Sequence, residues 1–99
     1  MDIAIVGATG NVGRKIIEVL ENKNFPVSEL YLIASSKSSG QKINFKNKKY
    51  TVIDLEKFDF SKSKIAFFAA GSSVAEKWAP IAAKKTIVID NSKYFRKDP

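Results

Sequence analysis

Short apolar runs alternate along this chain with segments whose apolar residues recur at helical spacing. Residues 1–6 (MDIAIV) are apolar except for Asp2 and precede a glycine, which predicts a strand buried on both faces of a parallel sheet. In residues 11–22 the apolar side chains fall on one helical face, with charged side chains largely outside it. That apolar face consists of Val12, Ile16, Ile17 and Leu20. Asn22 and the extended geometry favoured before Pro26 predict the end of this helix.

Three further apolar runs predict buried strands at residues 30–34 (LYLIA), 65–70 (IAFFAA) and 86–89 (TIVI). Between the last two, Ser73 and Glu76 have the spacing of a capping box, in which each side chain binds a backbone amide at the start of a helix. The pattern therefore predicts a second helix that begins close to Ser73.

Two features complicate this simple alternation. The second helix contains Pro80, which lacks a backbone N–H and crowds the preceding turn, so we expect a kink or a break and restart near Ala79. Weaker strand candidates lie at residues 42–45 and 50–53. The expected turn between these two strands is formed by Asn47 and Lys48.

The resulting order is strand, helix, strand, small strand pair, strand, helix, strand. It predicts parallel strands joined by crossover helices, an α/β fold of the doubly wound, Rossmann type with a mostly parallel sheet. A chain of 99 residues that is 44% hydrophobic has the size and composition of one globular domain. Because a sheet of this type would continue into another strand, we expect residues 1–99 to form an N-terminal domain that is incomplete at its C-terminal end.

Three glycines mark the junction of the first strand and the first helix. Gly7, Gly10 and Gly13 follow the pattern G-x-x-G-x-x-G, in which small residues permit a tight turn, close helix packing and the approach of a pyrophosphate to the helix N-terminus. A merely structural tight turn is the alternative. The position between a strand and a helix at the start of the chain favours a dinucleotide-binding loop.

The loop after the second strand bears on the choice of dinucleotide. Domains selective for NAD usually place Asp or Glu about twenty residues beyond the glycine loop, where the carboxylate binds the ribose 2′-hydroxyl. This chain has no acidic residue in residues 34–40 (ASSKSSG). Lys37, with the serine hydroxyls that flank it, would instead hold a 2′-phosphate, which predicts NADP. The alternative is a flexible polar loop with an incidental lysine.

Gly71 and Trp78 are further candidates near the predicted sheet edge. Gly71 follows the strand at residues 65–70, so it either borders the cofactor or simply begins the next helix. Trp78 is expected to pack in the core rather than to stack on a ligand.

Composition excludes several kinds of chemistry within these residues. The chain has no cysteine and no histidine, so it offers no thiolate nucleophile, no imidazole base and neither a thiolate nor an imidazole as a metal ligand. The net charge of +7 raises nucleic acid as a partner, but the lysines are scattered without interleaved aromatic residues, which favours a solvated surface. No apolar run is long enough to span a bilayer and no signal peptide is evident, so we expect a cytoplasmic protein without membrane or nucleic-acid partners.

The chain resembles the aspartate-semialdehyde dehydrogenases across nearly its whole length. The matching segments are VGATGNVG (6–13), ASSKSSG (34–40), FFAAGSSVAEKWAPIAAKK (67–85) and VIDNSKYFRKDP (88–99). The resemblance implies an enzyme of amino-acid biosynthesis, in the lysine, threonine and methionine branches, that interconverts aspartyl 4-phosphate and aspartate semialdehyde plus phosphate with NADP. The family's catalytic cysteine and histidine would lie beyond residue 99, so no catalytic residue is expected in this chain, which should be inactive alone. The full-length protein would be a homodimer or a higher oligomer.

Carried over by position, the resemblance assigns the cofactor loop, the 2′-phosphate loop, a nicotinamide wall and substrate phosphate binding. The cofactor loop would be Thr9, Gly10, Asn11 and Val12, and the 2′-phosphate loop would be Ser35, Lys37 and Ser38. Gly71 would form the nicotinamide wall, and Asn91 and Arg96 would bind the substrate phosphate. The family usually has arginine where Lys37 stands, and lysine keeps the charge but lacks the planar fork, so selectivity for NADP over NAD is expected to be weaker. Without the resemblance, Arg96 would be interpreted as an exposed loop arginine.

Two alternatives to this function remain open from the residues. A non-catalytic NADP-binding or redox-sensing module would use the same glycine loop and would explain the absence of cysteine and histidine. A reductase of N-acetylglutamyl phosphate would share the fold and the chemistry, although the segments KWAPIAAKK and DNSKYFR resemble it less.

Overall fold

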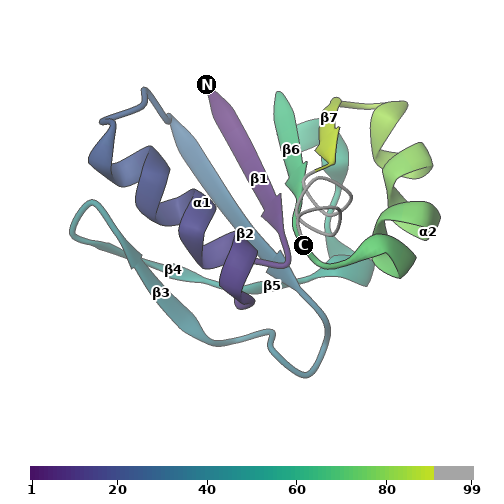
Figure 1. The fold of residues 1–99 in the computed structure, drawn as a ribbon, viewed down its shortest axis with the longest axis horizontal. Helices are drawn as coiled ribbons and strands as arrows, with labels where there is room; N and C mark the ends of the chain where they lie inside the picture. Colours follow the sequence, from purple (N-terminus) through teal and green to yellow (C-terminus); the bar gives the residue numbers. More distant parts are fainter. Residues whose placement is uncertain (91–99) are drawn as a thin grey trace, which may run out of the picture.

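A computed structural model describes residues 1–90 of the chain, so Asn91 and Arg96, both predicted to bind substrate phosphate, lie outside the described residues. A five-stranded sheet in the order β5-β2-β1-β6-β7 forms the centre of the molecule, and all its strand pairs are parallel (Figure 1). Its strands are β1 (Asp2–Val6), β2 (Glu29–Ala34), β5 (Ile53–Asp54), β6 (Ile65–Phe68) and β7 (Ile87–Asp90). The prediction of a doubly wound α/β fold is confirmed.

Strand β1 occupies the middle of the sheet and is buried on both faces, as its apolar run predicts. Ile3 and Ile5 point into a core shared with α1 (Asn11–Asn22), whereas Ala4 and Val6 point into a second core shared with α2 (Ser72–Ala83). Apolar side chains therefore cover both faces of the sheet.

The first core is closed by α1 and by a β-hairpin. Ile17 and Leu20 on the inner face of α1 pack with Phe45 and Val52 of the hairpin segment. In the second core Ala75 and Ala82 of α2 pack against the sheet, and the rings of Phe60 and Phe68 stack with centroids 5.9 Å apart. Trp78 packs partly buried against this second core, as expected.

The hairpin consists of β3 (Lys42–Phe45) and β4 (Lys48–Thr51), and its turn lies one residue earlier than predicted. Lys46 and Asn47 form the turn with φ angles of 50° and 67°, as in a type I′ turn. Contacts with the end of α1 hold this tip: the Lys46 amide donates to Glu21 Oε2 at 2.7 Å, and Lys46 Nζ donates to the Phe25 carbonyl at 3.0 Å.

The strand predicted at residues 50–53 is wrong in its extent. Its first part belongs to β4, but Ile53 and Asp54 leave the hairpin and pair in parallel with Ile33 and Ala34 of β2. The chain thus passes from the hairpin to the central sheet at Val52, whose side chain is buried in the first core.

Two short 3-10 helices after β5 were not predicted. They are η1 (Leu55–Lys57) and η2 (Phe60–Lys62), and each begins at an aspartate whose carboxylate accepts a backbone N–H two residues on, at 3.0 Å. At η2 the hydrogen bonds from Ser61 hold the pKa of Asp59 below its usual value.

Helix α2 differs from the prediction at its N-terminus and at Pro80. Its N-cap is Gly71, without any side-chain cap, so the capping box expected from Ser73 and Glu76 is wrong. The helix also continues through Pro80 to Ala83 instead of breaking and restarting near Ala79. Pro80 is exposed, whereas Ala75 and Ala82 on either side of it are buried and hold the helix on the sheet. Neither helix is long and apolar enough to cross a membrane within residues 1–90.

Replacement of Pro80 tests how much stability the proline costs helix α2. We expect Pro80→Ala to raise the free energy of unfolding by about 1–3 kcal/mol, because alanine restores the missing helical N–H and removes the steric conflict. Urea unfolding followed by circular dichroism measures this difference. A variant less stable than the parent would contradict it.

Candidate functional site

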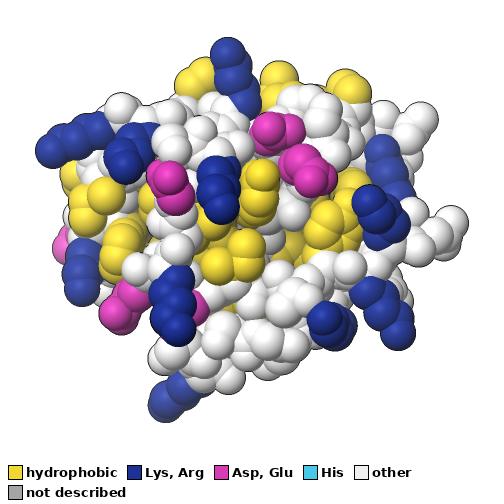
Figure 2. Space-filling model, turned by 180° about the vertical axis from the view of Figure 1, so that it is seen from behind, with side chains coloured by type: hydrophobic (Ala, Val, Ile, Leu, Met, Phe, Trp, Pro, Cys, Tyr) yellow, Lys and Arg dark blue, Asp and Glu magenta, His cyan; other side chains and the backbone are white. Residues whose placement is uncertain are grey.

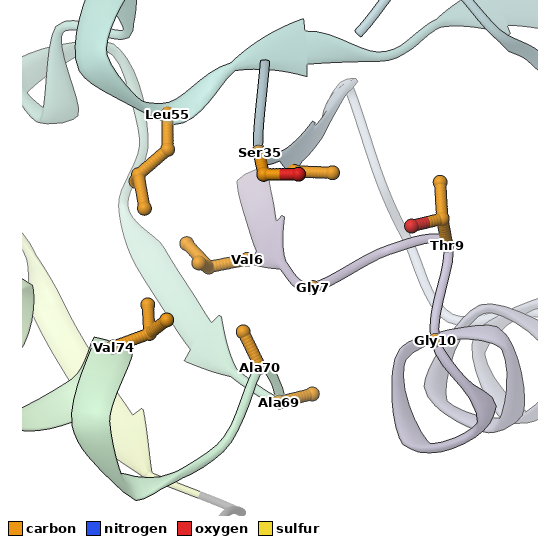
Figure 3. A pocket seen from close by; sticks show the side chains of 10 residues that line it. Val6, Gly7, Thr9, Gly10, Ser35, Leu55, Ala69, Ala70 and Val74 are labelled. Atoms are coloured by element: carbon orange, nitrogen blue, oxygen red, sulfur yellow. The ribbon is translucent and has the colours of Figure 1, made fainter. Parts of the chain in front are cut away.

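A pocket of about 320 Å³ opens beside the carboxyl ends of β1, β2 and β6 (Figure 3). In doubly wound folds ligands bind at this edge of the sheet, where connections to the helices diverge. Three loops and the first turn of α2 contribute its walls. The lining residues are Val6, Gly7, Thr9, Gly10, Ala34, Ser35, Leu55, Ala69, Ala70 and Val74.

Two of the three predicted glycines are required by the fold itself. A Cβ atom on Gly13 would overlap the carbonyl oxygen of Gly7, so α1 approaches the end of β1 more closely than any side chain permits. Gly7 has a φ of 90°, and a Cβ there would lie 2.7 Å from the amide nitrogen of Ala70. Gly7 therefore also lets the loop after β1 contact the loop after β6.

Gly10 differs from the other two because no contact with residues 1–90 requires a glycine there. Its φ of −83° suits any residue, and an added Cβ would meet no atom closer than Gly7 O, at 3.6 Å. Gly10 is exposed, lines the pocket and is the N-cap of α1. The absence of a side chain at this position leaves space for a ligand to approach the backbone.

The N-terminus of α1 offers donors for an anion. No side chain caps this end, and the first turn carries no acidic residue. The amides of Asn11, Val12 and Gly13, which begin the helix, have no acceptor within the helix, and the helix dipole adds partial positive charge. Arg14 Nε donates to the Thr9 carbonyl at 3.1 Å and so braces the loop. Sequence reasoning did not single out this contact.

The loop after β2 lies beside the same pocket. Ser35 lines the pocket, and the amides of Ser38 and Ser39 donate to its carbonyl at 2.9 and 3.1 Å, which folds the loop into a single tight turn. Lys37 is exposed, Ser38 is half-buried, and Lys37 forms no ion pair with any residue from 1 to 90. Of the predicted residues in this turn, Ser35 lines the pocket, whereas Lys37 and Ser38 are not among its lining residues.

The structure brings some predicted site residues together and leaves others aside. Gly7, Thr9, Gly10 and Ser35 line the pocket, and the rest of the glycine loop forms the first turn of α1 behind it. Gly71 begins α2, with a φ of 103°, and does not line the pocket itself.

Several lining residues were missed by sequence reasoning. Leu55 follows β5, whose two residues give no periodic pattern. Val74 lies in the first turn of α2 and lines the pocket across from Leu55. The strand at 65–70 did point to the sheet edge at Ala69 and Ala70. Within residues 1–90 no cluster of three potential metal ligands occurs.

Charged side chains are dispersed over the face of the molecule seen from behind. In Figure 2 Lys and Arg side chains are spread over the surface, with acidic and apolar groups between them. Within residues 1–90, Lys15 forms an ion pair with Glu18 and Lys85 forms one with Asp59, and both pairs are exposed. This is the distribution of a solvated surface.

Comparison with known proteins agrees with this geometry. The family model described as semialdehyde dehydrogenase, NAD binding domain, matches residues 2–99. The chain belongs to this family. The assignment confirms the prediction of a domain that binds a nicotinamide dinucleotide.

Relatives within the family are similar over almost the whole chain. An aspartate-semialdehyde dehydrogenase of Aquifex aeolicus is 52% identical over 99 residues, and aspartate-semialdehyde dehydrogenase 2 of Vibrio cholerae is 48% identical over 98 residues. Each alignment covers 98% of this chain, which spans only 29% of the length of these curated relatives.

Solved structures from the family have the same fold. The crystal structure of aspartate semialdehyde dehydrogenase II from Vibrio cholerae, complexed with ASA, superposes with a TM-score of 0.91 at 48% identity, covering 98% of this chain and 32% of that one. A probable aspartate-semialdehyde dehydrogenase from Pseudomonas aeruginosa gives a TM-score of 0.87 at 41% identity, covering 91% of this chain and 27% of that one.

The different demands on Gly10 and Gly13 lead to a stability prediction. Gly13→Ala should lower the free energy of unfolding by about 3 kcal/mol, because the new methyl would overlap backbone atoms that cannot move independently. Gly10→Ala should lower it by no more than about 1 kcal/mol, since its Cβ meets only an ordinary contact and alanine is a weaker helix N-cap than glycine. Urea unfolding of both variants measures the contrast, and equal losses of stability would contradict it.

Proposed function

We propose that this chain is the cofactor-binding part of an NADP-dependent oxidoreductase that interconverts aspartyl 4-phosphate and aspartate 4-semialdehyde plus phosphate. The observation that carries this proposal is the uncapped N-terminus of α1 behind Gly10, at the mouth of a pocket in a family whose relatives bear that enzyme's name. The enzyme would serve amino-acid biosynthesis.

The residues present suit a dinucleotide with an additional phosphate. The amides of Asn11, Val12 and Gly13 would bind the pyrophosphate, and the bare backbone at Gly10 would let it approach. Lys37 would pair with the 2′-phosphate, with the hydroxyls of Ser35 and Ser38 as donors. NADPH, when bound, would supply the hydride that reduces the acyl group.

The choice of NADP over NAD follows from charge. A carboxylate at the end of β2 would attract the ribose hydroxyls of NAD and repel a phosphate, but the turn at residues 35–40 carries none. A lysine is a compact charge without the planar fork of arginine, so we infer a preference rather than strict selectivity.

The chemical step needs groups that these 99 residues lack. The chain contains no cysteine and no histidine, so a thiolate nucleophile and an imidazole acid-base group would have to come from outside it. Asn91 and Arg96 are proposed to bind the substrate phosphate, for which a guanidinium offers two parallel hydrogen bonds. We further propose that the whole enzyme is a homodimer or a higher oligomer, and that the isolated 99-residue chain is inactive.

A second candidate is a non-catalytic NADP-binding or redox-sensing module. The absence of cysteine and histidine favours it, because such a module needs the glycine loop but no nucleophile. The two candidates share the cofactor and differ in turnover.

An activity assay separates the two candidates. We expect the full encoded protein to form NADPH, detected by its absorbance, when given aspartate semialdehyde, phosphate and NADP, with arsenate able to replace phosphate as an oxyanion of the same shape. The chain limited to residues 1–99 is the matched control and should show no turnover, since it has no thiolate. No turnover by the full protein, together with tight NADPH binding, would support the non-catalytic module.

Removal of the loop cation tests the choice of cofactor. Lys37→Ala should weaken NADPH binding about tenfold, the loss expected for one charge-assisted hydrogen bond, and leave NADH binding nearly unchanged. Lys49→Ala removes an equally exposed lysine from β4 and is the matched control for net charge. Calorimetric titration measures all four affinities, and an equal loss for both cofactors would argue against contact between Lys37 and the 2′-phosphate.

A further inference from the structure

Both ends of the loop at residues 35–40 lie beside one short segment of the chain, residues 52–54. Where the loop starts, Ala34 of β2 pairs with Asp54 of β5. Where it ends, the Gly40 amide donates to the Val52 carbonyl at 2.9 Å, and the Val52 amide donates to the carbonyl of Gln41 at 2.8 Å. Residues 52–54 therefore close the loop at both ends.

The anchor of this closure is one of the least exposed parts of the molecule. Val52 is only 2% exposed and packs in the core with α1 and the hairpin. The segment that follows it reaches the pocket directly, because Leu55 lines the wall opposite the glycine loop. A single stretch of chain thus fixes the loop and forms part of the pocket.

The loop's internal hydrogen bonds leave its outward groups available. Its carbonyls at Ser35 and Ser36 accept bonds from within the turn, the latter from Ser39 Oγ at 2.9 Å. By contrast, the hydroxyls of Ser35 and Ser38 and the amine of Lys37 have no hydrogen-bond partner among residues 1–90. The closure therefore holds in place a turn whose side-chain donors at Ser35, Lys37 and Ser38 are not used within residues 1–90.

Gly40 is the residue on which this closure depends. Its φ of 90° lies in the region that side chains disfavour, although an added Cβ would meet nothing within 4 Å. The glycine is thus required by backbone geometry and not by lack of space. A residue with a Cβ would have to rotate away from this φ, which would disturb the hydrogen bond from the Gly40 amide to Val52.

We propose that Gly40, through its closure on Val52, positions the Ser35–Gly40 turn and thereby determines the preference for a dinucleotide that carries a 2′-phosphate. Gly40 itself touches no part of the ligand in this arrangement and acts through Ser35, Lys37 and Ser38. The inference rests on the proposed function, because it assumes that this turn binds the 2′-phosphate.

The test compares NADPH and NADH binding by calorimetry in the full encoded protein. Gly40→Ala should weaken NADPH binding about tenfold, as expected when a charge-assisted hydrogen bond to phosphate is misplaced, while NADH binding changes less than about twofold. Gly40→Asn should restore part of the preference, because asparagine tolerates positive φ better than alanine. A merely structural role would lower both affinities together.

Asn47→Ala is the matched control. Asn47 also has a positive φ, 67°, and is exposed, but it lies in the turn at the end of the β3–β4 hairpin that is far from Gly40, so its replacement should strain the backbone there and leave the NADPH-to-NADH ratio unchanged. Equal binding of both cofactors by the unaltered protein would refute the proposed 2′-phosphate site, and the role of Gly40 with it. A preference that survives Gly40→Ala, or that falls equally in Asn47→Ala, would refute the role of Gly40 alone.

Discussion

The close approach of α1 to the end of β1 is the constraint on which the rest of this structure depends. Gly13 has no Cβ, so the first turn of the helix rests directly on the carbonyl of Gly7. Gly7 in turn rests on the backbone at Ala70, so the two loops that flank the pocket are in direct contact. The position of the pocket is therefore set by backbone contacts, which vary less than contacts between flexible side chains.

The same constraint separates fold from function within one motif. Gly7 and Gly13 serve packing, whereas Gly10 has room for a side chain that it does not carry. Glycine is a favoured helix N-cap, and at this exposed position it also leaves the backbone beside the pocket uncovered. The pattern G-x-x-G-x-x-G thus contains two positions that backbone packing requires and one, Gly10, that packing within residues 1–90 leaves unconstrained.

The sequence predicted most of the sheet and one side of the site. Strands β1, β2, β6 and β7 were found because apolar runs buried on both faces stand out from their polar surroundings, and α1 because its apolar face is regular. Two-residue β5 and the two 3-10 helices were missed, since their pairing partner and caps depend on where Val52 enters the core. The wall formed by Leu55 and Val74 was missed for the same reason, because each residue reaches the pocket only through tertiary packing.

Errors around α2 show how tertiary packing overrides local preference. Ser73 and Glu76 have the spacing of a capping box, yet the helix begins earlier, at the residue after Gly71, whose φ of 103° turns the chain sharply out of the loop. Pro80 costs helical stability locally, but burial of Ala75 and Ala82 on the sheet spans it on both sides. The first turn of α2 is thereby held against the pocket, where Val74 faces Leu55 across the space beside the glycine loop. Local preference would have placed that turn elsewhere, so packing of α2 on the sheet determines the shape of the pocket on this side.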